Sequence, residues 1–450
     1  MRREGVAPRV AFYVCFFLGD LAGGCEAVLA GGFAITEQSA SAAGTATAGA
    51  GAIAEDAGTV FYNPAGMSFL ESDQLLIAGN VFFLDNDFSN RGTADGTGNP
   101  IVGTEDFKNP VIPVGSLFGV VELTDGIKLG LGITSPFGLS SEYEDEWVGR
   151  YNTLLSAITT IDINPAVSVR VTDWLSIGAG FSAQFAEGRR RNDLDFGTIC
   201  FNQFFGPGSC TALGLVPQGA DGRLTIKASD WGFGYNLGVL IAPQPQTRIG
   251  IAYRSEVHHR LEGDADYDVP AAAMPLTLGG SLFQNTDASA EITLPASLSA
   301  SLYHELSPQL ALLGDITWTR WRSFETLRID FANPAQPDIV QEEDWKDVFR
   351  YSIGLRYKPA EPYVVRLGFA YDETPIRDSL RNPGIPGNDR LVFAIGAGIR
   401  LSEAITIDLG YTYNHELDAS VRQFRPESGT VAGDYRNRVH ILSGQLRWTF

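Results

Sequence analysis

The feature that most constrains this chain is an alternation of apolar and polar residues, which recurs in segments from residue 73 to the C-terminus. In the last eleven residues the apolar side chains share one side of an extended strand, and they are Leu442, Leu446, Trp448 and Phe450. A strand between lipid and a wet lumen has this period of two over about 9 to 11 residues. A half-buried soluble strand alternates too, so the number of such strands decides between the two.

Connections of two alternating lengths separate the segments. Short turns fall at 124–126, 172–173, 243–246, 306–309, 358–362 and 401–404. Longer connections fall at about 85–110, 139–157, 188–226, 263–289, 330–346, 378–389 and 418–434. Together they join fourteen strands, an even number with both ends on the short-turn side, and closing such a sheet leaves no unpaired edge in lipid. The sequence therefore predicts an all-β fold, a 14-stranded antiparallel transmembrane β-barrel over residues 73–450.

The charges indicate which side of each strand faces the lumen. In residues 349–358 the apolar side alternates with Arg350, Arg356 and Lys358. Arg or Lys facing lipid costs about 2 to 4 kcal/mol at the bilayer midplane, so the charged side is the inner one. Residues 175–185 and 405–413 show the same division, with small or polar residues inside.

The composition excludes other classes of protein. Beyond residue 30 no apolar run approaches the length of about 18 residues that a spanning helix needs. The formal charge of -20 disfavours nucleic acid as a partner, because phosphates need a basic face. No cluster of His or Cys has the spacing of a metal site, and no cofactor motif is present, so neither a metal nor a cofactor is expected.

Residues 1–30 have the pattern of a secretory signal peptide, in which Arg2, Arg3 and Arg9 flank an apolar run and small residues end it. Its removal would leave two of the four cysteines, Cys200 and Cys210, in an oxidising compartment. These two could close a disulfide within one loop, and two unpaired thiols are the alternative.

Residues 31–72 do not alternate. A run of small residues, 39–54, precedes Glu55 and Asp56, and the segment Asn63, Pro64, Ala65, Gly66 follows. About forty residues rarely fold alone, and a fourteen-strand barrel is too wide for its wall side chains to fill. We therefore predict a small helical hatch that plugs the lumen. A disordered tail is the alternative, which the apolar residues of the segment disfavour.

Several motifs resemble one family in the same order along the chain. In the predicted hatch they are Gly32-Phe33, residues 37–40, residues 49–56 and Asn63-Pro64-Ala65; in the barrel they are residues 135–139, 147–151 and 164–166. This set resembles the FadL-type outer-membrane transporters of long-chain fatty acids, aromatic hydrocarbons and other hydrophobic compounds. The resemblance implies a monomeric plugged barrel in the outer membrane of a Gram-negative bacterium. It also implies that ligand is captured outside and released sideways into the membrane, beside a kinked third strand.

Physical chemistry supports such a route for a hydrophobic ligand. Each methylene group that moves from water into an apolar site is stabilised by about 0.8 kcal/mol of free energy. Apolar residues around the two cysteines are candidates for capturing the ligand, and they are Phe201, Phe204, Phe205, Leu213, Leu215 and Val216. Residues 269–278 form a second apolar patch. The alternative is that both apolar sets only pack one loop against another.

The predicted lateral gate is the segment Ser135, Pro136, Phe137, Gly138 at the end of the third strand. Proline cannot donate to a ladder and glycine has no side chain to pack, so pairing should fail there. A strand that simply ends is the alternative. We expect Asn63-Pro64-Ala65 to face this gap, although an ordinary Asn-Pro turn would have the same sequence.

An anionic head group would need a cation in the lumen. By parity, Arg350, Arg356 and Arg366 point inward, and Arg150 follows the gate in sequence. The alternative is that these arginines pair with acids of the lumen or the hatch, such as Glu37, Glu55 or Asp56.

Three functions compete. Passive uptake of hydrophobic molecules leads, and the sequence leaves open whether the ligand is a fatty acid or an aromatic hydrocarbon. An enzyme is disfavoured, because none of the five histidines accompanies a nucleophile motif. A structural or adhesive surface barrel would have no use for a hatch opposite a strand breaker.

Overall fold

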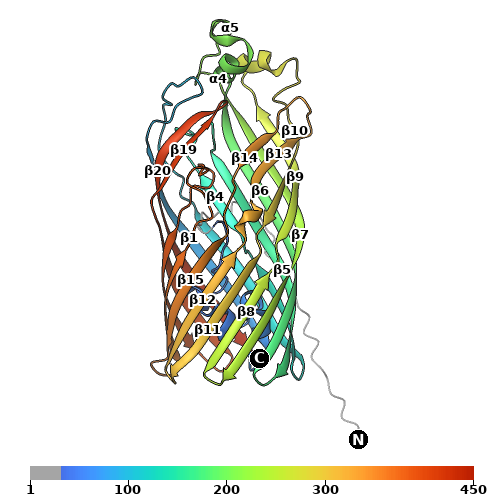
Figure 1. The fold of residues 1–450 in the computed structure, drawn as a ribbon, viewed down its shortest axis with the longest axis vertical. Coiled ribbons are helices and arrows are strands. Elements are labelled where there is room, and N and C mark those ends of the chain that lie inside the picture. The colour runs from blue at the N-terminus through green and yellow to red at the C-terminus, as the bar shows by residue number, and fades with distance from the viewer. Residues whose placement is uncertain (1–31) are drawn as a thin grey trace.

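The computed structural model describes residues 32–450, so the predicted signal peptide lies outside the described residues. The chain forms a closed antiparallel barrel, and the prediction of fourteen strands is confirmed (Figure 1). The first and last strands close it with a ladder that runs from Gln74↔Thr449 to Asn90↔Gly433. Within residues 32–450, no helix has the length and apolar character needed to span a bilayer.

Eight strands of the wall are continuous. They are β1 (Gln74–Asn90), β2 (Val111–Thr124), β5 (Leu155–Thr172), β6 (Leu175–Asp195), β7 (Asp221–Gln244), β16 (Tyr363–Asp372), β17 (Arg390–Arg400) and β20 (Gly429–Thr449). The other six consist of two segments each. They are β3 (Ile127–Thr134) with β4 (Gly138–Glu142), β8 (Thr247–Arg254) with β9 (Val257–Asp268), β10 (Thr286–Leu294) with β11 (Ser297–Ser307), β12 (Leu310–Thr319) with β13 (Thr326–Phe331), β14 (Ile339–Glu342) with β15 (Val348–Tyr357), and β18 (Ile405–Glu416) with β19 (Ala419–Arg425).

The helices are short. Those of the N-terminal segment are α1 (Ala40–Ala43), α2 (Ala50–Ile53), α3 (Thr59–Tyr62) and the 3₁₀ helix η1 (Pro64–Phe69). The long connections carry α4 (Phe196–Ile199), the π-helix η2 (Cys200–Phe204), α5 (Gly206–Ala212) and the 3₁₀ helices η3 (Ala271–Thr277) and η4 (Trp321–Ser323).

All six short turns lie where the sequence predicts them, but several strands are longer than predicted. β6 and β7 remain paired up to Asp195↔Asp221, whereas the sequence predicts a loop over 188–226. Above Phe185 the outward residues of β6 become charged, and Glu187 and Arg189 form an ion pair of 3.8 Å there. Apolar alternation therefore marks the part of a strand that faces lipid, while the backbone ladder continues into water.

The outer face is apolar on every strand. Each strand exposes at least one large apolar side chain, and examples taken in order around the wall are Ile77, Val121, Leu131, Ile163, Ile177, Leu237, Ile251, Leu302, Ile316, Ile353, Leu367, Ile395, Leu409 and Leu442. A soluble sheet would bury these side chains in a core. The buried apolar residues instead lie on the inner face and in the N-terminal segment, so this surface is suited to acyl chains.

The N-terminal segment lies inside the lumen as a hatch, at the end of the barrel that carries the short turns (Figure 1). α1 packs on β17, β18 and β20, α2 packs on β8 and β11, and η1 packs on β5, β6 and β7. Glycines in the wall permit this contact: a Cβ on Gly178 would lie 2.4 Å from the backbone nitrogen of Ala65, and one on Gly250 would lie 2.0 Å from the carbonyl oxygen of Gly51. The small residues of the hatch and the wall glycines therefore let two backbones touch.

Candidate functional site

The third strand breaks at the predicted gate. β3 pairs with β5 up to Thr134↔Asp162, and β4 resumes the pairing at Gly138↔Thr159, so three residues oppose two. The ladder between β2 and β3 ends at Leu117↔Ile133, whereas β2 remains paired with β1 as far as Val111. The third strand thus leaves β2 at the break and continues beside β5, which leaves a gap in the wall between β2 and β4. The backbone nitrogen of Lys108 bounds this gap by donating to the carbonyl of Glu142 (3.0 Å).

The hatch fills this break from inside. The backbone nitrogen of Ile35 donates to the carbonyl of Pro136 (2.9 Å), and the nitrogen of Gly138 donates to the carbonyl of Phe33 (2.8 Å). Gln38 binds both sides of the opening, because its amide nitrogen donates to the carbonyl of Ser135 (2.9 Å) and its amide oxygen accepts from the hydroxyl of Ser116 on β2 (2.9 Å). The first residues of the hatch therefore close the gap.

The prediction that Asn63 faces this gap is wrong. Its amide nitrogen donates to the carbonyl of Gly51 (2.7 Å) and to the carbonyl of Val239 on β7 (3.1 Å), and its amide oxygen accepts from the nitrogen of Ala65 (3.1 Å). Gly238 leaves the space for it, because a Cβ there would lie 2.0 Å from the amide oxygen. Asn63 and the adjoining η1 thus anchor the hatch to the wall away from the third strand.

The other predicted hatch residues are also anchored. The carboxylate of Asp56 accepts from the hydroxyl of Ser41 (2.7 Å) and from the amide of Gln445 on β20 (3.1 Å). The carbonyl of Ala65 accepts from the hydroxyl of Ser176 on β6 (2.7 Å). A Cβ on Gly66 would lie 2.0 Å from the hydroxyl of Thr59, so only glycine fits there.

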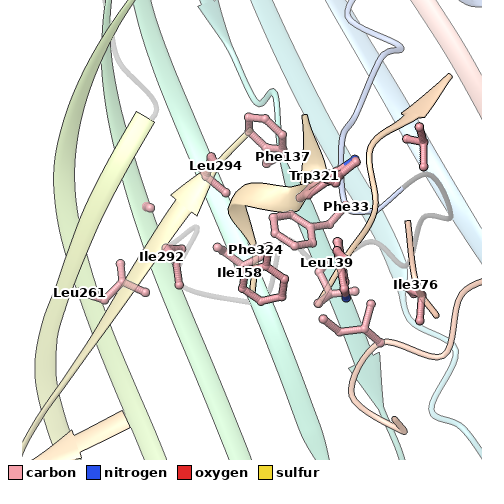
Figure 2. Close-up of a cluster of buried hydrophobic side chains, with 14 of the residues drawn as sticks. Phe33, Phe137, Leu139, Ile158, Leu261, Ile292, Leu294, Trp321, Phe324 and Ile376 are labelled. Carbon is pink, nitrogen blue, oxygen red and sulfur yellow. The ribbon is translucent and has the colours of Figure 1, made fainter. Parts of the chain in front are cut away.

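An aromatic cluster lies beside the break, and Figure 2 shows its rings converging from hatch and wall. The ring of Phe33 lies 4.7 Å from Trp321, 6.0 Å from Phe324 and 6.1 Å from Phe137, measured between centroids. Gly32 has a φ of 69°, and a Cβ on it would lie 2.2 Å from the Trp321 ring. The cluster thus joins the hatch, the third-strand break and η4 in one apolar contact.

An apolar cavity of about 110 Å³ adjoins this cluster, and we call it the apolar chamber. Its lining is mainly apolar and includes Phe33, Leu139, Ile158, Leu261, Ile292 and Phe324. Arg189 and Arg190 on β6 also line it, and Arg189 pairs with Glu187 (3.8 Å). The Nε of Arg190 has no hydrogen-bond partner within the described part of the chain, and one Nη donates to the carbonyl of Asn152 (3.5 Å). A largely apolar cavity with one such cation is suited to a hydrophobic anion.

Polar groups surround Arg190 on the side away from the chamber. The guanidinium of Arg425 donates to the side-chain oxygen of Gln341, and Glu343 accepts from the indole nitrogen of Trp345 (3.0 Å). Burial raises the pKa of Glu343 to about 7, so this carboxyl is only partly ionised near neutral pH. It therefore offsets only part of the positive charge of the two arginines.

The structure places the predicted head-group arginines differently. Arg356 and Arg366 both bind Glu55 of the hatch, at 3.0 and 3.2 Å, and Arg366 also binds Asp408 at 2.7 Å. Arg150 lies in the outer loops, where it contacts Asp221 (3.3 Å) and the hydroxyl of Tyr151 (2.8 Å). The alternative stated for the sequence, pairing with acids of the hatch and lumen, is therefore confirmed for Arg356 and Arg366. The Nε of Arg366 has no hydrogen-bond partner among residues 32–450. Arg350 lines a second cavity, described below.

The sequence analysis missed Arg190, because it assigned this residue to a loop and applied no parity there. The run Arg189, Arg190, Arg191 could have revealed it. In an extended strand the middle residue of three points to the opposite face from its neighbours. If the strand is continued through the run, Arg190 points inward.

The candidate capture residues lie at the outer end of the barrel (Figure 1). A disulfide joins Cys200 and Cys210, and these two pack with Leu215, Phe196 and Leu276 in a small core between the two loops. Phe201 and Phe204 pack partly against this core. Five neighbouring side chains are exposed, namely Phe205, Leu213, Val216, Met274 and Leu278. The predicted set thus divides into a buried part and an exposed apolar patch, which we call the loop patch.

Known proteins resemble this chain over nearly its whole length. The family model described as outer membrane protein transport protein (OMPP1/FadL/TodX) matches residues 22–450. An outer membrane protein of Neisseria meningitidis is 30% identical, over 94% of this chain and 95% of the relative. The long-chain fatty acid transport protein of Escherichia coli O6:H1 is 29% identical, over 85% of this chain and 86% of the relative.

A solved structure agrees with the fold. The crystal structure of a Pseudomonas aeruginosa FadL homologue superposes with a TM-score of 0.84 at 23% identity, covering 93% of this chain and 100% of that one. The chain therefore belongs to the OMPP1/FadL/TodX family, and it is an outer-membrane transporter of hydrophobic compounds in Gram-negative bacteria, not an enzyme.

Proposed function

We propose that this protein is a monomeric channel for passive uptake of long-chain fatty acids. Ligand is captured on the loop patch, enters the apolar chamber, and leaves sideways into the bilayer between β2 and β4. The observation that carries the proposal is the combination of an apolar chamber, a cation in its lining and a wall that opens beside it. The fatty acid transport protein among the relatives supports the same substrate class.

Arg190 favours a fatty acid over an aromatic hydrocarbon. Burying a cation whose charge is only partly offset is costly, and a hydrocarbon ligand would leave that cost in place. A carboxylate would accept a charge-assisted hydrogen bond from the free Nε, while its chain fills the apolar lining. An aromatic hydrocarbon channel of the same fold is the second candidate, since the rings around Phe33 offer stacking surfaces.

Arg190→Gln is expected to separate these candidates. Removing a charged hydrogen bond should weaken binding of a long-chain fatty acid by roughly 10- to 100-fold and leave the alcohol of equal chain length within about twofold. Fluorescence displacement on the purified protein in neutral detergent measures both affinities.

The control variant is Arg260→Gln, which removes an exposed arginine on β9 and should change neither affinity. Equal losses for acid and alcohol would show that Arg190 supports the fold of the chamber only. No loss for either would reject Arg190 as a head-group residue and favour the hydrocarbon channel.

The loop patch is expected to matter most when ligand is scarce. Replacing Phe205 and Leu213 by serine removes two exposed apolar side chains and keeps the disulfide and the buried core beneath them. Because a large apolar side chain contributes about 1.5 to 3 kcal/mol when fully buried, uptake at subsaturating fatty acid should fall by about fivefold or more. Uptake at saturating ligand should be unchanged.

Initial rates of labelled oleate uptake in cells measure this effect. The matched control is Val340→Ser, which removes an exposed apolar residue of β14 outside the patch. If the double variant and the control gave the same concentration dependence, capture by the loop patch would be ruled out.

A further inference from the structure

A second cavity of about 140 Å³ lies between the hatch and the wall, and we call it the polar chamber. Its lining includes Ala34, Ile35 and Thr36 of the hatch, and Pro136 and Phe137 of the third-strand break. Its volume is roughly ten times the 10 to 15 Å³ that one water molecule needs. Phe137 lines this chamber and Phe33 lines the apolar chamber, and both rings belong to the aromatic cluster beside the break (Figure 2). The polar chamber thus borders both the third-strand break and the cluster that lines the apolar chamber.

Arg350 on β15 lines the polar chamber, and two of its three guanidinium nitrogens are unused. One Nη donates to the carbonyl of Ala46 (3.1 Å), to the hydroxyl of Ser352 (3.0 Å) and to the hydroxyl of Thr47. The Nε and the other Nη have no hydrogen-bond partner among residues 32–450, and the side chain is only 8% exposed. The carboxylate of Asp372 stands 3.7 Å from Nε, beyond hydrogen-bonding distance.

The other charges of the polar chamber are already bound. Arg390 donates to Asp372 (2.9 Å), and Arg254 donates to Asp162 (3.2 Å). Asp315 accepts hydrogen bonds from the hydroxyls of Ser301 and Thr317. The lining thus contains three guanidinium groups and two carboxylates, and Arg350 is the lining arginine whose donors stay open within residues 32–450. Asp162, which binds Arg254, raises the count to three carboxylates, so the charges balance and Arg350 is distinguished by its two nitrogens without a hydrogen-bond partner.

The Nε and the adjacent Nη of one guanidinium form the fork that binds a carboxylate through two parallel hydrogen bonds. We propose that the polar chamber is a second carboxylate subsite, in which Arg350 holds the head group of the ligand before it leaves through the third-strand break. This inference rests on the proposed fatty acid transport. A cationic step between the apolar chamber and the gap lowers the cost of keeping a carboxylate ionised away from water.

The test measures binding and not uptake, so that it stands apart from the transport proposal. The protein is purified in neutral detergent with the Arg190→Gln background, which removes the other head-group candidate. Hexanoate labelled with ¹³C at the carboxyl is titrated and followed by NMR, with hexanol as the neutral probe. We expect hexanoate to bind more tightly than hexanol. Arg350→Lys keeps the positive charge but loses the two parallel donors, so it should weaken the affinity for hexanoate by about tenfold or more.

Two variants complete the test. Arg356→Lys makes the same change on the same strand at an arginine outside the chamber, and it should leave hexanoate binding unchanged. Ala252→Leu fills the chamber without altering any charge, and it should abolish hexanoate binding even if the Arg350 variant fails to fold. The subsite proposal would be overturned by equal binding of hexanoate and hexanol. It would also be overturned by hexanoate binding that survives both Arg350→Lys and Ala252→Leu. Neither result would contradict the transport proposal. Normal hexanoate binding by a protein that supports no fatty acid uptake in cells would instead overturn the transport proposal and leave the subsite standing.

Discussion

Replacing Gly138 by arginine is expected to reduce uptake of labelled long-chain fatty acid to the level of cells that lack the protein. The backbone nitrogen of Gly138 holds the hatch carbonyl of Phe33, and a Cβ at Gly138 would lie 2.8 Å from the tip of Ile35. A long charged side chain at this point would fill the space between the hatch and the third strand.

The matched control is Gly138→Ala. Its single methyl group meets only the flexible end of Ile35, which can move, so uptake should remain near the normal rate. Barrel assembly is monitored in both variants by heat-modifiable migration on a gel. Normal uptake by a correctly assembled arginine variant would reject lateral release through this gap.

Replacing Glu55 by glutamine is expected to release the hatch. Glu55 is the shared partner of Arg356 and Arg366, and its carbonyl accepts from Arg447 at 2.6 Å. Removing one partner of a buried ion pair leaves an uncompensated charge and costs about 3 to 5 kcal/mol. Because the wall ladder does not involve Glu55, this loss should appear as a hatch that opens at lower urea, while the barrel persists.

Proteinase K cleavage within residues 40–62 as a function of urea measures hatch opening, and ion conductance in a planar bilayer measures the resulting leak. Glu361→Gln is the control, since Glu361 pairs with Arg400 at the surface and such pairs contribute about 0 to 1 kcal/mol. Indistinguishable urea profiles for the two variants would mean that the Glu55 cluster does not hold the hatch.

The wall could be predicted residue by residue. The outward side chains of β15, such as Phe349 and Ile353, and the inward Arg350 follow from parity alone. Lipid and lumen act on each residue separately, and a strand alternates strictly between them. The gate could also be located, since Pro136 and Gly138 disrupt pairing through properties of their own.

The contents of the lumen could not be predicted in the same way. The sequence assigned Asn63 to the gap, whereas Gln38 and Phe33 close it. The sequence left Arg356 and Arg366 open either to a ligand or to acids such as Glu55, and the structure shows that Glu55 binds both. Parity gives the face on which a side chain lies, and it does not give the height at which the hatch meets the wall.

By itself, the sequence determined that this chain forms a closed barrel of fourteen strands with an apolar outer face, because period-two alternation and turn chemistry are local properties. Only the tertiary structure decided which arginines remain open to a ligand. Glu55 and Arg366 are far apart in the chain, and whether they meet depends on how deeply the hatch lies among the wall glycines. Arg190 and Arg350 keep unused donors, because no carboxylate of residues 32–450 comes within hydrogen-bonding distance of them.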